Sequence, residues 1–245
     1  LRLILRSRRV DAEFDIGLRA VAIERLRIDA EAAAVLLGGG PQHHEAAIAE
    51  GADTLLVHHG LFWRGQDGTV TGWMKQRLAL LLAHDINLLA YHLPLDAHET
   101  LGNNAQLGLR MGWQVHGRFG EQRLGWLGTP AQATTHAQAL TRDLQTSLGI
   151  EPVAVVPDPA RPIRTIAWCT GGAQSWFEAA IAEGVDAFVT GEISEPQAHL
   201  ARENGVAFFA CGHHATERYG APAFAAHVCD AMGVTHRFID IDNPA

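Results

Sequence analysis

Short apolar runs of strand length recur along this chain, and each is followed by a turn containing glycine or proline and then by a helical pattern. This order is typical of successive βα units. The runs cover 54–57, 86–91, 165–168, 187–189 and 206–210. The helical patterns cover 41–50, 75–84, 103–111, 133–148, 175–183, 194–204 and 222–232. Alternating strands and helices predict an α/β fold with mostly parallel sheets and helices on their faces.

The middle of the chain, 113–162, departs from this alternation. It is richer in Gly, Gln, Thr and Pro, and it contains Pro157-Asp158-Pro159. We interpret it as a connection or a change of subdomain. The 245 residues suffice for one large α/β domain or for two smaller intertwined ones.

Composition excludes several classes of protein. The formal charge of −8 opposes a nucleic-acid backbone, and no apolar run approaches the roughly 20 residues of a membrane span. Cys169, Cys211 and Cys229 are too scattered for a disulfide framework or a paired zinc-ligand spacing. We therefore expect a soluble protein of a reducing cytoplasm.

The first 40 residues are rich in arginine. A solvated arm and a targeting or nucleic-acid-binding segment both fit this stretch, and we favour the arm because a secretory signal would need an apolar core of roughly 7–15 residues. The arginines are Arg2, Arg6, Arg8, Arg9, Arg19, Arg25 and Arg27.

Histidine is the unusual residue of this chain. The 14 histidines include the adjacent pairs His43-His44, His58-His59 and His213-His214. Neutral imidazole is the commonest metal ligand, which makes metal binding the first hypothesis. Polar residues also gather at the carboxyl ends of the predicted strands, the edge where open α/β sheets bind ligands. They are His58, His59, His92, Asp96, Thr190, Glu192, His213 and Glu217.

The pair His58-His59 directly follows a predicted strand. Successive side chains of an extended strand point to opposite sides, so the pair suits two metal ions better than one. In the alternative interpretation one histidine caps the strand and the other packs in the core.

His213 and Glu217 are four residues apart at the start of a predicted helical turn, so both side chains lie on one face and can hold one ion. Alternatively, Glu217 interacts with the helix dipole beside a solvated histidine. Asp96 offers an oxygen ligand that can bridge two ions, or it is an exposed aspartate in a turn stiffened by Pro94.

Two further features have both a binding and a structural interpretation. The turn 169–172 offers backbone N–H groups to an anion such as phosphate, but a plain tight turn fits it better. Trp63 and Trp73 flank the loop after His59 and can stack on a planar base or pack in a core.

The remaining histidines receive secondary roles. His92 and His98 are reserve ligands or proton carriers, and a plain surface role is favoured for His98. His214 points away from the His213 face. His43-His44 is expected on an exposed helix start.

Six ordered motifs between 51 and 245 resemble the GTP cyclohydrolase I type 2 homologue family, also called the NIF-three-like dinuclear metal-centre proteins. The motifs are VHHGLFW (57–63), YHLPLDAH (91–98), LGNNAQLG (101–108), AWCTGG (167–172), VTGE (189–192) and GHHATER (212–218). The first 40 residues depart from the family pattern.

The resemblance implies two interlinked α/β halves, a metal-binding half made of 1–115 with 212–245 and a second half made of 116–211. It also implies a toroidal homohexamer whose metal sites face an internal cavity. Two divalent ions per subunit, of Zn, Mn, Fe or Ni, would be held by ligands from both ends of the chain. These ligands are His58, His59, Asp96, His213 and Glu217.

Two ions about 3.5–4 Å apart can lower the pKa of a bridging water toward neutrality, which predicts a hydrolase. The resemblance implies opening of the GTP purine ring at C8 with release of formate. His92 or Glu192 would carry protons, and the Gly171-Gly172 turn would receive phosphate. The alternative is a non-catalytic metal-binding regulatory or scaffold protein that acts through a hexameric ring.

Overall fold

The computed structural model describes residues 2–7, 10–15, 32–36, 40–131 and 135–245. Of the N-terminal arginines, Arg8, Arg9, Arg19, Arg25 and Arg27 lie outside the described residues. The chain forms two units. Unit 1 comprises 1–98 with 221–242, and unit 2 comprises 99–220 with 243–245.

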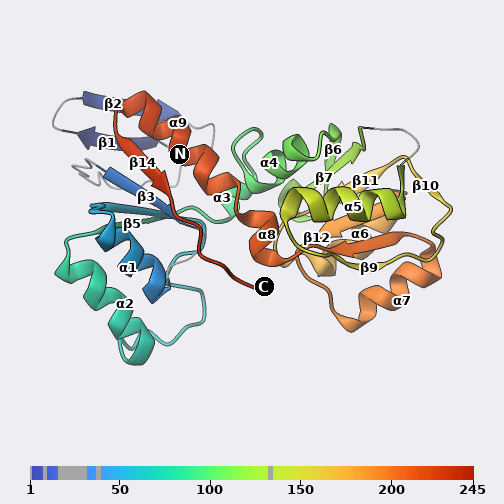
Figure 1. Ribbon diagram of the computed structural model, residues 1–245, viewed down its shortest axis with the longest axis horizontal. Helices are drawn as coiled ribbons and strands as arrows, with labels where there is room; N and C mark the ends of the chain where they lie inside the picture. Colours follow the sequence, from blue (N-terminus) through green and yellow to red (C-terminus); the bar gives the residue numbers. More distant parts are fainter. Residues whose placement is uncertain (1, 8–9, 16–31, 37–39, 132–134) are drawn as a thin grey trace. The chain divides into compact units, whose positions relative to one another are not determined.

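Unit 1 is built on a four-stranded parallel sheet of order β14-β3-β4-β5 (Figure 1). Its strands are β14 (Thr235–Phe238), β3 (Ala32–Leu36), β4 (Thr54–Val57) and β5 (Asn87–Ala90). Its helices are α1 (Pro41–Ala49), α2 (Gly72–Ala83), α3 (Leu93–Asp96) and most of α9 (Gly220–Met232). The strands β1 (Arg2–Ser7) and β2 (Val10–Asp15) form a separate antiparallel hairpin.

The core of unit 1 follows from the alternation of β4. Leu55 and Val57 point to the same face and are fully buried, and they pack with Ala47 of α1 and with Met74 and Leu81 of α2. Helices α1 and α2 therefore cover one face of this sheet. The strands and helices predicted here are confirmed, with α2 beginning a few residues earlier than expected.

Unit 2 contains a six-stranded sheet of order β6-β7-β11-β12-β13-β9 (Figure 1). Its strands are β6 (Gln114–Phe119), β7 (Gly125–Thr129), β11 (Ile166–Trp168), β12 (Ala187–Thr190), β13 (Ala207–Ala210) and β9 (Val153–Val155). The three central strands are parallel, while β6, β7 and β9 pair antiparallel. The α/β class is confirmed, but the expectation of mostly parallel pairing holds only for the sheet of unit 1 and for the centre of this one.

The interpretation of 113–162 as a connection was wrong for much of its length, because β6, β7 and β9 lie within it. Some glycines of this segment serve close packing rather than turns. A Cβ on Gly128 would lie 2.6 Å from the carbonyl oxygen of Gln114 and 2.9 Å from the ring of Trp168. These strands need glycine because large side chains cross directly over them.

Helices cover both faces of the second sheet. They are α4 (Asn103–Arg110), α5 (Ala137–Leu148), α6 (Phe177–Ala182), α7 (Glu195–Asn204) and the short α8 (His213–Glu217). The strands β8 (Thr135–His136) and β10 (Pro162–Ile163) form a small antiparallel pair.

The two faces of this sheet carry separate cores. Phe209 packs with Trp168 and Leu144 in one core, whereas its neighbour Phe208 packs with Phe177 in the other. Alternate strand residues point to opposite faces, which explains the division. Each of these fully buried side chains contributes about 1.5–3 kcal/mol of hydrophobic stabilisation, so β13 is firmly held on both sides just before the residues of α8.

Among the described residues, no helix combines the length and the apolar character that crossing a bilayer would require.

Candidate metal centre

Three histidines of unit 1 meet at one edge of its sheet. His58 and His59 follow β4, and His92 follows β5 after Tyr91. Because β4 and β5 are parallel neighbours, their carboxyl ends lie at the same edge. One ring nitrogen from each histidine lies within 4.8 Å of the others, a spacing that could hold a metal ion.

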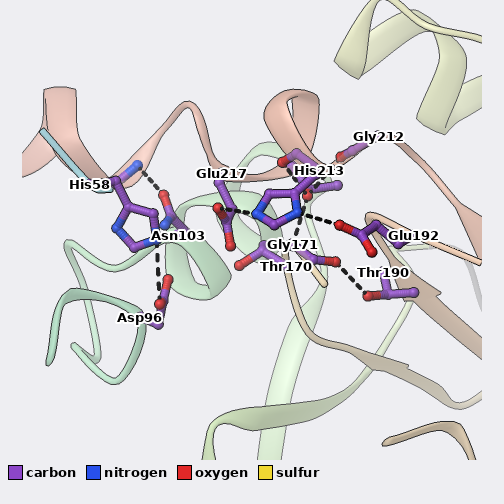
Figure 2. Close-up of polar contacts among 12 residues, drawn as sticks. His58, Asp96, Asn103, Thr170, Gly171, Thr190, Glu192, Gly212, His213 and Glu217 are labelled. Atoms are coloured by element: carbon purple, nitrogen blue, oxygen red, sulfur yellow. Dashed lines mark hydrogen bonds and ion pairs between the residues drawn. The ribbon is translucent and has the colours of Figure 1, made fainter. Parts of the chain in front are cut away.

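His58 is held in one orientation. It is fully buried, and its Nδ1 lies 2.9 Å from the carbonyl oxygen of Tyr91. Because a carbonyl only accepts, Nδ1 carries the proton and Nε2 carries the lone pair that a metal ion would need. That Nε2 lies 3.5 Å from Oδ2 of Asp96 (Figure 2).

Asp96 reaches His58 from helix α3, which begins directly after His92 with a proline in its first turn. The carboxylate is buried, so the alternative of an exposed turn aspartate is wrong. Because Nε2 of His58 carries a lone pair, it does not donate to this carboxylate, and a cation held by both groups would compensate the buried charge. Unit 1 therefore brings together three of the five expected ligands, His58, His59 and Asp96, with His92 beside them.

Unit 2 contributes a histidine between two carboxylates. Nε2 of His213 lies 3.0 Å from Oε2 of Glu217, and Nδ1 lies 2.6 Å from Oε1 of Glu192 (Figure 2). The hydrogen bond with Glu217 is the main cause that raises the pKa of His213 to about 9; burial opposes this rise, and Glu192 adds to it. The i, i+4 spacing of His213 and Glu217 in α8 does place both donors on one face, as expected.

The turn after β11 packs against this pair. Gly171 has a φ of +68°, and a Cβ there would collide with the Glu217 carboxylate and lie 3.1 Å from Nε2 of His213. The Gly171 N–H donates to Oγ1 of Thr216 at 3.0 Å, and its carbonyl accepts from Oγ1 of Thr190 at 3.1 Å. Only glycine permits this close backbone approach.

The same turn is not an open anion cradle. The N–H of Thr170 donates to Oδ1 of Asn104 at 2.9 Å, and the N–H of Ala173 donates to the carbonyl of Gly171 at 3.0 Å. Together with the Gly171 N–H, these donors are already engaged within the protein. The tight-turn interpretation fits these hydrogen bonds, and the phosphate role of Gly171-Gly172 stays a prediction.

Trp63 lies directly beside the unit 1 histidines. Its ring centroid is 5.6 Å from that of His59 and 5.1 Å from that of His92. The indole Nε1 donates to the carbonyl of Gly60 at 3.1 Å, while 44% of the residue is exposed. Trp73 is also exposed, with the guanidinium of Arg77 over its ring at 4.6 Å.

The expectation that His43-His44 lies on an exposed helix start was wrong for His44, which is fully buried. His44 shares a helix face with the buried Ala47, three residues along α1. Burial is the main cause that lowers the pKa of His44 to about 4, and Arg77 lowers it further. His98 and His214 are half-buried, and the N–H of His214 donates to the carbonyl of Ala245 at 2.9 Å.

The donors of both units fit a divalent transition metal. They are imidazole nitrogens and carboxylate oxygens without thiolate, a set that suits Zn, Mn, Fe or Ni. In unit 2, the space that a Cβ on Gly171 would fill lies directly against Nε2 of His213 and the Glu217 carboxylate. Residues that sequence reasoning missed, Thr216 and Asn104, fix this turn through hydrogen bonds that no local pattern reveals.

Comparison with known proteins agrees with the resemblance read from the motifs. The family described as Duf34/NIF3 (NGG1p interacting factor 3) matches residues 21–244. A protein of Neisseria meningitidis serogroup B named GTP cyclohydrolase 1 type 2 homolog is 54% identical over 199 residues, which are 81% of this chain and 79% of that protein. The homolog of the same name from Pseudomonas aeruginosa is 49% identical over 207 residues, covering 82% and 80%.

Solved structures agree with the fold. The protein ybgI, described as of unknown function, is 38% identical with a TM-score of 0.84, covering 95% of this chain and 92% of that one. The Thermus thermophilus protein TTHA1606 is 30% identical with a TM-score of 0.78, covering 88% and 86%. These matches confirm the predicted family.

Proposed function

Because this chain belongs to the Duf34/NIF3 family, we propose that it is a metal-dependent hydrolase with a dinuclear centre. One observation carries the proposal. Imidazole and carboxylate donors converge in each unit, at one sheet edge in unit 1 and around helix α8 in unit 2. Convergent donors of this kind favour a metal site over a set of unrelated surface residues.

We propose that both units supply metal ligands. His58, His59 and Asp96 of unit 1 and His213 and Glu217 of unit 2 would hold two divalent ions of Zn, Mn, Fe or Ni. Two such ions would supply a nucleophile near neutral pH, since a pair of divalent ions can lower the pKa of a water molecule.

The residues around the ligands have assignable tasks. The carbonyl of Tyr91 fixes Nδ1 of His58, which leaves Nε2 for the ion. We assign proton transfer to His92, which is half-buried beside His58 and His59. Glu192 is the other proton carrier suggested by the sequence. Both of its oxygens are engaged, by His213 and by Gln174, which favours His92.

We propose GTP as the substrate, opened at C8 of the purine ring with release of formate. The name GTP cyclohydrolase 1 type 2 homolog, carried by the relatives, supports this choice. Trp63 supports it independently, since an exposed indole beside the proposed ligand His59 offers a stacking surface for a planar base. We further propose that the protein acts in the cytoplasm as a toroidal homohexamer.

The test is GTP turnover in chain stripped of metal and then reloaded with Zn²⁺, Mn²⁺, Fe²⁺ or Ni²⁺ separately. Turnover that saturates, requires one of these ions and disappears in His58→Ala is the expected result. The control is His84→Ala, which changes an exposed histidine and should keep full activity. Equal turnover in stripped wild type, or full turnover in His58→Ala, would refute the proposal.

A second candidate, a metal-binding scaffold without catalysis, is favoured by one observation. The segment after β4 exposes large apolar side chains, with Phe62 72% and Val70 48% exposed in the loop and Trp73 51% exposed at the start of α2. Apolar side chains exposed together often mark a contact surface. Metal binding with no turnover of any nucleotide, and dissociation of the assembly in Phe62→Ser, would support this role over the hydrolase.

A further inference from the structure

We infer that Glu192 is the positioning residue of His213, and that Gln174 and Gln197 hold Glu192 in place. The inference rests on the proposed role of His213 as a metal ligand. It adds a task to Glu192, which otherwise has no assigned function in the centre. All of these residues belong to unit 2.

The contact between Glu192 and His213 fixes the imidazole tautomer. An ionised carboxylate can only accept hydrogen bonds, so at 2.6 Å the Nδ1 of His213 must be the donor. When the histidine is neutral, its lone pair is then on Nε2, the nitrogen that faces Glu217 (Figure 2). A carboxylate behind a ligating imidazole also increases the basicity of the nitrogen that binds the ion.

Glu192 is itself held from its other side. Its Oε2 accepts a hydrogen bond of 3.1 Å from Nε2 of Gln174, which lies in the 3₁₀ turn Gln174–Trp176 after β11. The carbonyl of Gln174 accepts one of 3.0 Å from Nε2 of Gln197. The buried Gln197 is in turn fixed at the start of α7, where its Oε1 accepts from the N–H of Ser194 at 3.1 Å.

The backbone leaves this arrangement little room to shift. A Cβ on Gly191, the residue before Glu192, would lie 2.7 Å from both the Gly171 carbonyl oxygen and Cα of His213. The strand end that carries Glu192 is therefore pressed against the backbone of His213 itself. Three elements, the turn after β11, the end of β12 and the start of α7, jointly set the direction of one imidazole ring.

Glu192→Gln tests the inference because it keeps the side-chain shape and removes the charge. Competition with a chromophoric chelator would give the Zn²⁺ affinity, which we expect to fall about 10–100-fold, as for the loss of other outer partners of metal ligands. Gln174→Ala should cause a smaller loss in the same direction. The visible spectrum of the Co²⁺-loaded chain should also change in Glu192→Gln, because the ligand field at His213 changes.

The matched control is Glu195→Gln, which removes the same charge from an exposed position three residues later. Thermal unfolding of both metal-free variants would show whether folding is retained. Equal Zn²⁺ affinity and an identical Co²⁺ spectrum in the two variants would overturn the inference while leaving the metal centre intact. Weakened Zn²⁺ binding in Glu192→Gln would support it even if no GTP turnover were found, so the two proposals fail separately.

Discussion

The two units hold their candidate metal-binding histidines by different means. In unit 1, His58 is fixed by a backbone carbonyl and lies against two other imidazoles. In unit 2, His213 lies between two carboxylates, and the pKa of its imidazole is raised to about 9. The backbone carbonyl of Tyr91 sets the tautomer of the unit 1 ligand, whereas two carboxylates orient the unit 2 ligand, which must release a proton before an ion can bind.

Of the substitutions that test this difference, Gly171→Ala should change metal affinity the most. The new Cβ would collide with the Glu217 carboxylate and crowd His213, so Zn²⁺ affinity should fall by more than the roughly 100-fold expected for an outer partner. Chelator competition on the purified variant would measure the loss.

Gly184→Ala separates collision from backbone strain, because Gly184 has a similar φ of +74° but no atom within 4 Å of its Cβ position. Both variants should lose about 1–2 kcal/mol of stability from the left-handed backbone. Only Gly171→Ala should lose metal. Equal Zn²⁺ affinity in the Gly171→Ala and Gly184→Ala variants would show that the turn after β11 does not position the unit 2 ligands.

The difference in charge predicts a dependence on pH. Metal binding must displace the proton of His213, so affinity should rise about tenfold per pH unit as pH increases toward 9. Isothermal titration with Zn²⁺ in buffers of different ionisation enthalpy would count the released protons. A pH-independent affinity between pH 6.5 and 9 would contradict the role of His213 as a ligand.

The folding stability of the metal-free chain should fall as pH rises, whereas metal affinity should increase. The pKa of His213 is raised from 6.5 in the unfolded state to about 9 in the folded state. Its stabilising contribution is therefore fully present below pH 6.5 and is lost as pH rises through 9. The denaturant midpoint of the stripped chain should decline over this window, and less so in Glu192→Gln.

Trp63→Ala tests the proposed stacking of the Trp63 indole on the base of GTP. Loss of a stacking partner should weaken base binding by about 1–3 kcal/mol, which raises KM for GTP on the order of tenfold and leaves bound metal unchanged. Trp63→Phe should retain much of the affinity, and Trp73→Ala, in the first turn of α2, is the control. If Trp63→Ala and Trp73→Ala had equal KM values for GTP, the Trp63 indole would not contact the substrate.

Gln197→Ala should have the smallest effect. It removes the hydrogen bonds to Gln174 and Ser194 in a buried position, at a cost of about 1 kcal/mol in the free energy of unfolding. Metal affinity should fall slightly. Gln138→Ala, at an exposed position of α5, should change neither quantity, and denaturant unfolding would reveal any departure.

Local sequence patterns were sufficient to predict donor residues whose positions follow from the spacing within one helix or from the end of one strand. The i, i+4 relation of His213 and Glu217 and the strand end before His58-His59 both led to residues that the fold places in donor clusters. Asp96 was likewise selected by its position after a predicted strand, and family resemblance identified all five residues from its motifs.

Other features depend on contacts between distant segments. The hydrogen bond from His213 to Glu192 joins residues 21 apart in sequence, and the Gly171 N–H reaches Thr216 across 45. Neither has a local signal. The antiparallel strands β6 and β7 were missed because their segment is rich in glycine, which is a turn signal, whereas at Gly128 the close approach of Trp168 requires glycine within a strand.

The most direct test of the dinuclear centre is metal content per chain, by elemental analysis, in wild type, His58→Ala, His213→Ala and the control His84→Ala. The account predicts about two divalent ions in wild type and in the control, with a marked loss in each of the two ligand variants, although they lie in different units. Wild type without specifically bound metal, or full occupancy in either ligand variant, would contradict it.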